Sequence, residues 1–472
     1  MKLLLALISV TVIFYLSCLN WKRSVKALLV LLVLEGILRK WVLPQASEII
    51  YFLKDIVLFG AYFQYYLLGN RGTNFPKIKI QFFTIFLFLS FTWGLFQALN
   101  PSLGSPIVGI WGIKNYFYYV PIIWMFPDLF QSEAELKEFL KQQLVLFIPV
   151  GILGIVQFLS PASSPINSYA AGLEQVAGST ARFGVAGNVR ITGAFSYVNT
   201  YIPYLLFNIS VLLIFLEEKL PKKDSKILVA SGILLFLNSF MTGSRTIIFA
   251  GGLLFIGYFC VKSIGQFDRV WRILQWVLPP ILILTALIPI LFSEQVNTVL
   301  DRILLTSDLR VRLLLFVVEP IKNLKHTLLD GFGIGATHQA TGVLRSVLSL
   351  PPGKRIPVGY ESEMGRIVLE IGPIGFIFWY SLKFAIMGAL FSLYWKLKRP
   401  FLRNLALIAF LIQFIWLPNQ HVFHITYNVY YWFMTGFLYL LPHLEQVENL
   451  RQQYHLIQLY EQQPNYPDSS YR

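Results

Sequence analysis

The sequence predicts an all-α polytopic membrane protein with about 12 to 13 transmembrane helices. Of its 472 residues, 56% are hydrophobic and 13% are charged, and the mean hydropathy is +0.61. A soluble domain has roughly a quarter of its residues charged. The net charge of +15 comes from short Lys and Arg clusters between apolar runs. Such clusters are typical of loops that face the cytoplasm, and they do not indicate nucleic-acid binding.

Apolar runs near the 20 or so residues that a membrane span requires recur along the chain. No small-residue cleavage site follows the first run, so we expect a span there and no signal peptide. The predicted spans are 3–19, 25–43, 49–68, 80–99, 107–127, 143–160, 196–216, 227–242, 245–261, 273–292, 363–394, 405–418 and 425–441.

Basic loops set the expected orientation. The segments "WKRSVK", "NRGTNFPKIK", "EEKLPKKDSK", "KSIGQFDRVWR" and "KLKRPFLRN" follow every second span, as cytoplasmic loops do. We therefore expect two long segments outside the membrane, of which the second contains short helices. The predicted organisation is an N-terminal transmembrane bundle (1–160), an extracytoplasmic loop (161–195), transmembrane helices (196–292), a large extracytoplasmic loop (293–362), C-terminal transmembrane helices (363–441) and a cytoplasmic tail (442–472) whose polar end is disordered.

Ionisable residues gather at the outer ends of the second, third and fifth spans. They are Glu35, Arg39, Lys40, Lys54, Asp55 and Lys114. Ionisable residues inside a membrane are candidates for function. Arg39 and Lys40 can instead snorkel to the interface beside Trp41, and Glu35 can pair with Arg39. Because all six share one side, Lys54 and Lys114 are possible supporting residues of a site there.

Two arginines lie on the same predicted side. Arg190 closes the first long loop, and Arg245 occupies a turn between two spans. The N-terminus of the helix that follows such a turn favours an anion. The alternative for Arg245 is a snorkelling side chain, whose charge would oppose the helix dipole.

The second long loop predicts an amphipathic helix and a tight turn. Ser307 or Asp308 can cap a helix that runs to the region of Pro320. Arg310 and Arg312 lie about 200° apart on this helix, so only one of them can face a common site. The later "DGFGIG" lacks the strand–turn–helix context of a nucleotide site, and we expect a tight turn that returns the loop to the membrane.

The segment 359–375 carries charge into an apolar run. Glu363, Arg366 and Glu370 are spaced i, i+3 and i+7, which predicts one helix face and an ion-paired ladder.

Glu361 is the candidate catalytic base of the same segment. It lies in phase with Gly365, Val368 and Gly372, small positions that leave space for another helix or for a substrate. A carboxylate there can accept a proton from a hydroxyl. The alternative is a solvated loop residue.

Four motifs in order, "RITGAFSYVNTY", "MTGSRTIIFAGG", "LRVRLLLFVVEPIKNLKHTLLDGFGIG" and "ESEMGRIVLEIGPIG", resemble the O-antigen ligase and O-antigen polymerase superfamily over about residues 180–440. The segments "LEGILRKWVLP" and "YFLKD" resemble an N-terminal signature of its exopolysaccharide-associated members. The resemblance implies a GT-C-like helical fold and transfer of a glycan from a polyprenyl diphosphate on the outer face of the cytoplasmic membrane. It also implies that Arg245 and one of Arg310 and Arg312 bind the diphosphate. Ligases usually have His-Asn where this chain has Glu361 and Ser362, so a polysaccharide polymerase is favoured over a ligase.

The charged residues suit this chemistry. Arginines, with Arg190 added to Arg245, Arg310 and Arg312, would stabilise the leaving diphosphate, and Glu361 would take the proton of the incoming hydroxyl. No DxD pair or zinc pattern indicates a metal, and no cofactor is expected. His421 or His424 can stand in for the missing histidine.

The expected partners are a polyprenyl-diphosphate-linked glycan, an acceptor glycan, the bilayer and other polysaccharide assembly and export proteins. Two alternatives stay open. One is an O-antigen ligase with a lipid or protein acceptor, and the other is a non-enzymatic export or flippase component.

Overall fold

The computed structural model describes residues 2–69, 82–170, 182–183, 188–291, 293 and 307–462. Most of these residues are helical, and one antiparallel pair of two-residue strands, β1 (Arg182–Phe183) and β2 (Asn188–Val189), accompanies the helices. In the described part of the chain, five helices are long and apolar enough to cross a membrane: Glu133–Leu159, Val198–Phe215, Lys222–Met241, Arg245–Leu287 and Glu363–Lys396. Shorter apolar helices cover Leu7–Leu19, Phe82–Ala98 and Pro400–Ile415. The chain is a helical membrane protein.

The N-terminal half contains α1 (Lys2–Leu19), α2 (Trp21–Ile37), α3 (Ser47–Tyr51), α4 (Leu53–Tyr62), α5 (Phe82–Ala98), α6 (Pro106–Phe117), α7 (Ile122–Leu129) and α8 (Glu133–Leu159). Short helical turns η1 (Leu38–Val42), η2 (Pro44–Ala46), η3 (Phe63–Leu68), η4 (Pro101–Leu103) and η5 (Pro165–Asn167) join or extend them. The predicted span 107–127 is interrupted between α6 and α7, because Pro121 has no N–H to continue a helix. The hydroxyl of Tyr66 donates to the Pro121 carbonyl at 2.7 Å and ties this break to η3.

The C-terminal half contains α9 (Val198–Phe215), α10 (Lys222–Met241), α11 (Arg245–Leu291), α13 (Ser307–Asn323), η6 (Leu324–His326), α14 (Thr341–Val347), α15 (Glu363–Lys396), α16 (Pro400–Ile415) and α17 (Ile425–Gln462). The predicted spans 245–261 and 273–292 form the two arms of α11, which kinks where Gly265 has a φ of +92°. The helix predicted from Ser307 or Asp308 is α13. The segment 442–462 is the end of α17, where the sequence predicted a tail, and residues 463–472 lie outside the described residues.

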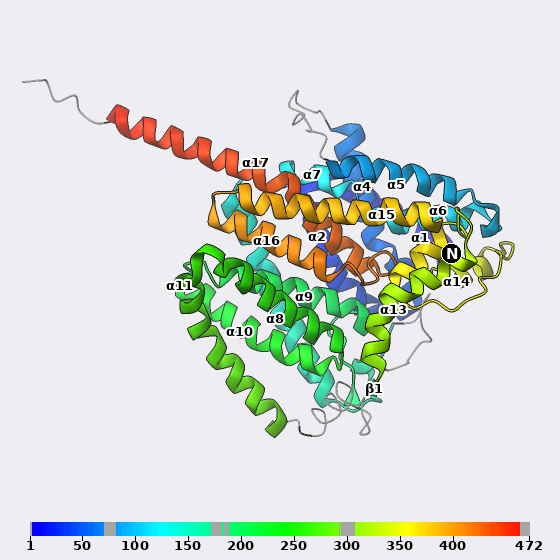
Figure 1. Ribbon diagram of the computed structural model, residues 1–472, viewed down its shortest axis with the longest axis horizontal. Coiled ribbons are helices and arrows are strands. Elements are labelled where there is room, and N and C mark those ends of the chain that lie inside the picture. The colour runs from blue at the N-terminus through cyan, green and yellow to red at the C-terminus, as the bar shows by residue number, and fades with distance from the viewer. Residues whose placement is uncertain are drawn as a thin grey trace, which may run out of the picture.

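α15 lies at the centre of the packing. It contacts α5, α13 and α16, while α7 packs on α17 and α8 on α10. Figure 1 shows the C-terminal half of α17 projecting from one end of the body, and β1, α13 and α14 gathered toward the other. The described helices and strands of the two long segments predicted to lie outside therefore lie away from the projecting end of α17.

The "DGFGIG" segment fills a break in α15. Pro373 cannot donate a helical hydrogen bond, and Gly372 before it has a φ of +67°. The freed carbonyls of the preceding turn accept the N–H groups of Phe332, at 2.7 Å, and Gly333, at 2.8 Å. A Cβ at Gly331 would lie 2.6 Å from the backbone nitrogen of Gly372, so only glycine fits there. The tight turn that returns the loop to the helices is confirmed.

Candidate functional site

A polar cavity of about 710 Å³ opens beside the first turn of α15. The loop that follows the tight turn lines one wall with Thr337 and His338, and the α16–α17 loop lines another with Gln420 and His424. The remaining lining residues are Asn199, Ala336, Gln339, Thr341, Gly342, Arg345, Tyr360, Glu361 and Arg366. The cavity thus joins four segments that are far apart in the sequence.

Arg366 supplies positive charge to the cavity. Its guanidinium donates from Nη2 to the Thr337 carbonyl at 2.6 Å and from Nε to the Thr337 hydroxyl at 3.2 Å. Nη1 lies 3.4 Å from Gln420 Oε1, and the group stacks 3.6 Å from the ring centroid of Phe423. These partners are neutral, and within the described residues Arg366 makes no ion pair. An arginine held in this way keeps its charge available to an anion.

The predicted ladder of Glu363, Arg366 and Glu370 is wrong, although the three residues do share a helix. Glu363 is fully buried and pairs with Lys383 at 2.6 Å, five turns further along α15. Its carboxylate also accepts from Nδ1 of His421 at 3.0 Å. Glu363 pairs with Lys383 and His421, and Arg366 bonds to Thr337, so neither side chain pairs with the other as the ladder required.

Glu370 is linked to Arg366 through a hydroxyl. Thr337 Oγ1 donates to Glu370 Oε1 at 2.8 Å while it accepts from Arg366, and the Thr337 N–H donates to the same carboxylate oxygen at 2.8 Å. The Tyr116 hydroxyl donates to the other oxygen at 2.9 Å. Glu370 therefore stabilises the loop that carries Thr337 and does not reach the cavity.

Glu361 lines the cavity with an exposed side chain. Its main chain is held on both sides: the N–H donates to Glu319 Oε1 at 2.8 Å, and the carbonyl accepts from Gln420 Nε2. Within the described residues the carboxylate itself makes no hydrogen bond or ion pair. The backbone is thus fixed while the carboxylate stays available to a ligand.

The helical phase assigned to Glu361 is wrong. α15 begins at Glu363, and the Ser362 hydroxyl caps it by accepting from the Gly365 N–H at 3.0 Å, so Glu361 precedes the helix. The space at Gly365 is taken by α13: a Cβ there would lie 2.6 Å from the carboxylate of Glu319. The small residue serves helix packing and not a substrate groove.

The structure separates the two histidines of the α16–α17 loop. His421 has no exposed surface, bonds to Glu363 and stacks on Tyr431 with ring centroids 4.3 Å apart. His424 lines the cavity, and its Nε2 lies 3.1 Å from Gln420 Oε1. Because that oxygen can only accept, Nε2 carries the proton and Nδ1 keeps its lone pair.

Burial, assisted by the charge of Arg366, lowers the pKa of His424 to about 4. Burial and the same arginine hold the pKa of His338 well below its usual value. Both rings are therefore neutral at pH 7. With Arg345 and Arg366 charged and Glu361 as the carboxylate, the titratable lining of the cavity has a net positive charge, which suits an anionic ligand.

Arg345 reaches the cavity from α14. Its guanidinium donates to the carbonyl of Leu103 at 2.7 Å and to that of Pro351. These contacts fix the side chain with neutral acceptors, as the contacts of Arg366 do.

The arginines predicted to bind the diphosphate lie elsewhere. Arg190 donates from Nε to the Thr242 carbonyl at 3.0 Å, in the turn that leads into Arg245 at the start of α11. Arg190 thus contacts the turn that precedes Arg245, but neither arginine is among the described residues that line the cavity. Arg310 and Arg312 fall in α13, and their side chains lie outside the described part of the chain.

Arg39, Lys40 and Lys54 are buried and bond to other parts of the protein, so they do not snorkel. Arg39 bonds to Glu35 at 3.0 Å, which confirms the predicted i, i+4 pair, and Lys54 bonds to the other oxygen of Glu35 at 2.6 Å. Lys40 donates to the Thr192 hydroxyl at 2.9 Å and to nearby carbonyls.

Lys114, the other predicted supporting residue, pairs with Asp55 at 2.7 Å. It therefore lies outside the polar cavity, as Lys54 does.

Several cavity residues were not predicted as site residues. Arg345 and Gln420 carry no motif, and Arg366 was assigned to the ladder. The dipeptide Thr337–His338, one residue after the glycine-rich turn, was a usable signal, since a turn that enters a helix bundle places the residues after it inside. Among the described residues, no three His, Cys, Asp or Glu side chains gather as metal ligands would.

Comparisons of the chain with models of protein families, with curated proteins and with solved structures gave no match. The class that the fold and the site define is a helical membrane protein with a basic polar cavity at one end of its helices.

Proposed function

We propose that the protein is a membrane glycosyltransferase of GT-C-like architecture. It would join polyprenyl-diphosphate-linked oligosaccharide units into an exopolysaccharide or O-antigen-type polymer on the outer face of the cytoplasmic membrane. The observation that supports this best is the cavity beside α15, where two arginines with neutral partners, an available carboxylate and a neutral histidine face one space.

The reaction needs two kinds of group, and the cavity has both. As the bond from the sugar to the diphosphate breaks, negative charge develops on the leaving oxygens, and Arg345 and Arg366 are placed to stabilise it. The hydroxyl of the incoming glycan loses a proton to the Glu361 carboxylate or to Nδ1 of His424. His421 is not a candidate base, because Glu363 and the stacked rings enclose it.

The test is polymer formation by the purified protein in nanodiscs supplied with lipid-linked repeat units. A product ladder is expected from the wild-type protein. Glu361→Gln should abolish turnover, because the amide cannot accept the proton, while binding of the lipid-linked donor changes little. Glu48→Gln removes an exposed carboxylate that does not line the cavity and serves as the control.

The outcomes separate the alternatives. Transfer of one unit to a lipid or protein acceptor with no ladder would indicate a ligase. A wild-type rate in Glu361→Gln together with loss of activity in His424→Gln would make the histidine the base. No product from any donor, at confirmed donor binding, would contradict the proposed activity.

A further inference from the structure

A second pocket, of about 650 Å³, lies between α1, α4 and α6. Its walls are apolar: Phe14 comes from α1, Phe59 from α4 and Ile110 from α6. Phe59 is 53% exposed and Ile110 67% exposed, so the pocket is a groove that opens on the outer surface of the helices. In a membrane protein that surface faces lipid.

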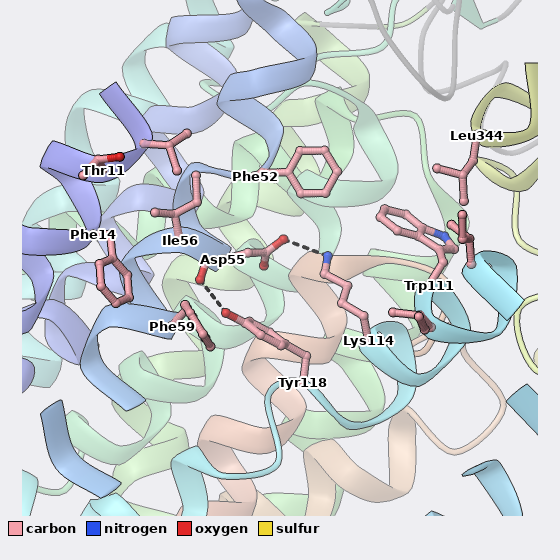
Figure 2. Close-up of a pocket in the computed structure, with 13 residues that line it drawn as sticks. Thr11, Phe14, Phe52, Asp55, Ile56, Phe59, Trp111, Lys114, Tyr118 and Leu344 are labelled. Atoms are coloured by element: carbon pink, nitrogen blue, oxygen red, sulfur yellow. Dashed lines mark hydrogen bonds and ion pairs between the residues drawn. The ribbon is translucent and has the colours of Figure 1, made fainter. Parts of the chain in front are cut away.

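An ion pair crosses the middle of the groove. Figure 2 shows Lys114 and Asp55 pointing at each other, with Phe14 on one side of the pair and Trp111 and Leu344 on the other. The two groups are 2.7 Å apart, and Lys114 Nζ is 5.1 Å from the Trp111 ring centroid. The pair is neutral as a unit, so the groove offers no net charge to a ligand. Its occupant should therefore be uncharged and apolar.

The groove adjoins the polar cavity. Trp111 lines the groove, and its ring meets the His338 ring of the cavity edge-on, with centroids 5.6 Å apart. On α14, Leu344 faces the groove and the next residue, Arg345, lines the cavity. An apolar groove beside a cavity with net positive charge is complementary to an amphiphile that has a hydrocarbon chain and an anionic head group.

We propose that this groove holds the isoprenoid chain of the lipid-linked donor while the diphosphate lies in the cavity near Arg345 and Arg366. The identity of the donor rests on the proposed function. The position of the chain rests on the groove itself. The bilayer is as apolar as the groove, so packing against Phe14, Phe59 and Ile110 holds the chain, and transfer from water contributes little. The groove thus aligns the donor and contributes modestly to its affinity.

The test compares two probes with the same head group, undecaprenyl diphosphate and geranyl diphosphate, in equilibrium binding to the full-length protein in nanodiscs. Ile110→Trp overfills the groove and should raise the Kd of undecaprenyl diphosphate about tenfold, which is about 1.4 kcal/mol of binding free energy. Binding of geranyl diphosphate should not change. Ile377→Trp is the matched control, since Ile377 is 61% exposed on α15 and does not line the groove.

A photoreactive amino acid at position 110 gives a measurement that does not depend on overpacking. Crosslinks to undecaprenyl diphosphate that excess unlabelled lipid removes would support the proposal. Crosslinks to phospholipid only, or equal weakening of both probes by Ile110→Trp, would overturn it. Because both assays measure binding, a protein that binds the chain here yet forms no polymer would contradict the proposed activity and leave the groove assignment intact.

Discussion

Replacing Lys383 with methionine should destabilise the protein by about 3–5 kcal/mol, as the loss of one partner of a buried ion pair does. Lys383 Nζ and Glu363 Oε1 are 2.6 Å apart, and the two side chains are 2% and 0% exposed. The carboxylate would keep only neutral donors, His421 Nδ1 at 3.0 Å and the Val422 N–H at 3.1 Å. Two such hydrogen bonds do not replace a cation in a low-dielectric core.

The double variant Glu363→Gln with Lys383→Met is the matched control. The glutamine oxygen can accept from the Val422 N–H, and its NH2 can donate to Nδ1 of a neutral His421 in the other tautomer, so no charge is left buried. We expect this variant to lie within about 1–2 kcal/mol of the wild type, which gives a coupling energy of at least about 2 kcal/mol. The measurement is the free energy of unfolding in mixed detergent micelles, followed by tryptophan fluorescence. A double variant whose loss equals the sum of the two single losses would refute the reasoning.

The pH dependence of Lys383→Met gives a second check. Burial and the charge of Lys383 lower the pKa of His421 to about 4. Without Lys383 the second cause disappears, and the ring can take a proton and pair with Glu363. The folded variant then binds more protons than the folded wild type as pH falls, so its deficit in unfolding free energy should shrink between pH 7 and pH 5. Adding His421→Gln to the variant should remove this recovery.

Three further predictions concern the site. Arg345→Lys should lose nearly as much polymerisation as Arg345→Ala at equal abundance, since lysine keeps the charge but not the forked contact. Full activity of the lysine variant would contradict a diphosphate role. In a background without the two native cysteines, a cysteine at Glu361 should react with an impermeant maleimide in intact cells. A cysteine at Gln452 of α17 should react only after lysis. The reverse pattern would invert the topology. The pKa of His424 is lowered to about 4 in the folded protein, so below about pH 6.5 the unfolded chain binds a proton that the folded protein does not. The free energy of unfolding should therefore fall by on the order of 3 kcal/mol between pH 6.5 and 4. His424→Gln should flatten that slope. An unchanged slope would mean that other groups control it.

The helices could be predicted from the sequence because each buries or exposes a long apolar surface, which composition alone reveals. Their interruptions could not. The kink at Gly265 depends on one positive φ inside an apolar stretch, and the break at Pro373 is tolerated only because backbone N–H groups of a distant loop satisfy the freed carbonyls.

Some of the residues that line the cavity were among those that the sequence singled out. The segment around Glu361 was identified from charge next to an apolar run, and His424 was named as a stand-in for the histidine of the resembled family; both residues line the cavity. The partners were mistaken, because spacing along one helix shows which residues share a face and does not show what faces them. Thr337 and Gln420, which hold Arg366, lie 29 and 54 residues away from it in sequence.

The arrangement of charge in depth distinguishes transfer from transport. A flippase needs polar groups along a route between the two membrane faces. On α15, Glu363 and Lys383 bond to each other and, through Glu363, to His421 with almost no exposed surface. Glu370 of the same helix is buried and bonds to Thr337 and Tyr116. At the end of the body near α17, Lys262 is likewise held by Glu217 at 2.6 Å. Charges that satisfy one another in this way present no binding sites to a moving head group. Among the described residues, the cavity brings Arg345, Arg366 and Glu361 together in one space, which supports chemistry at one place over passage of a head group along a route.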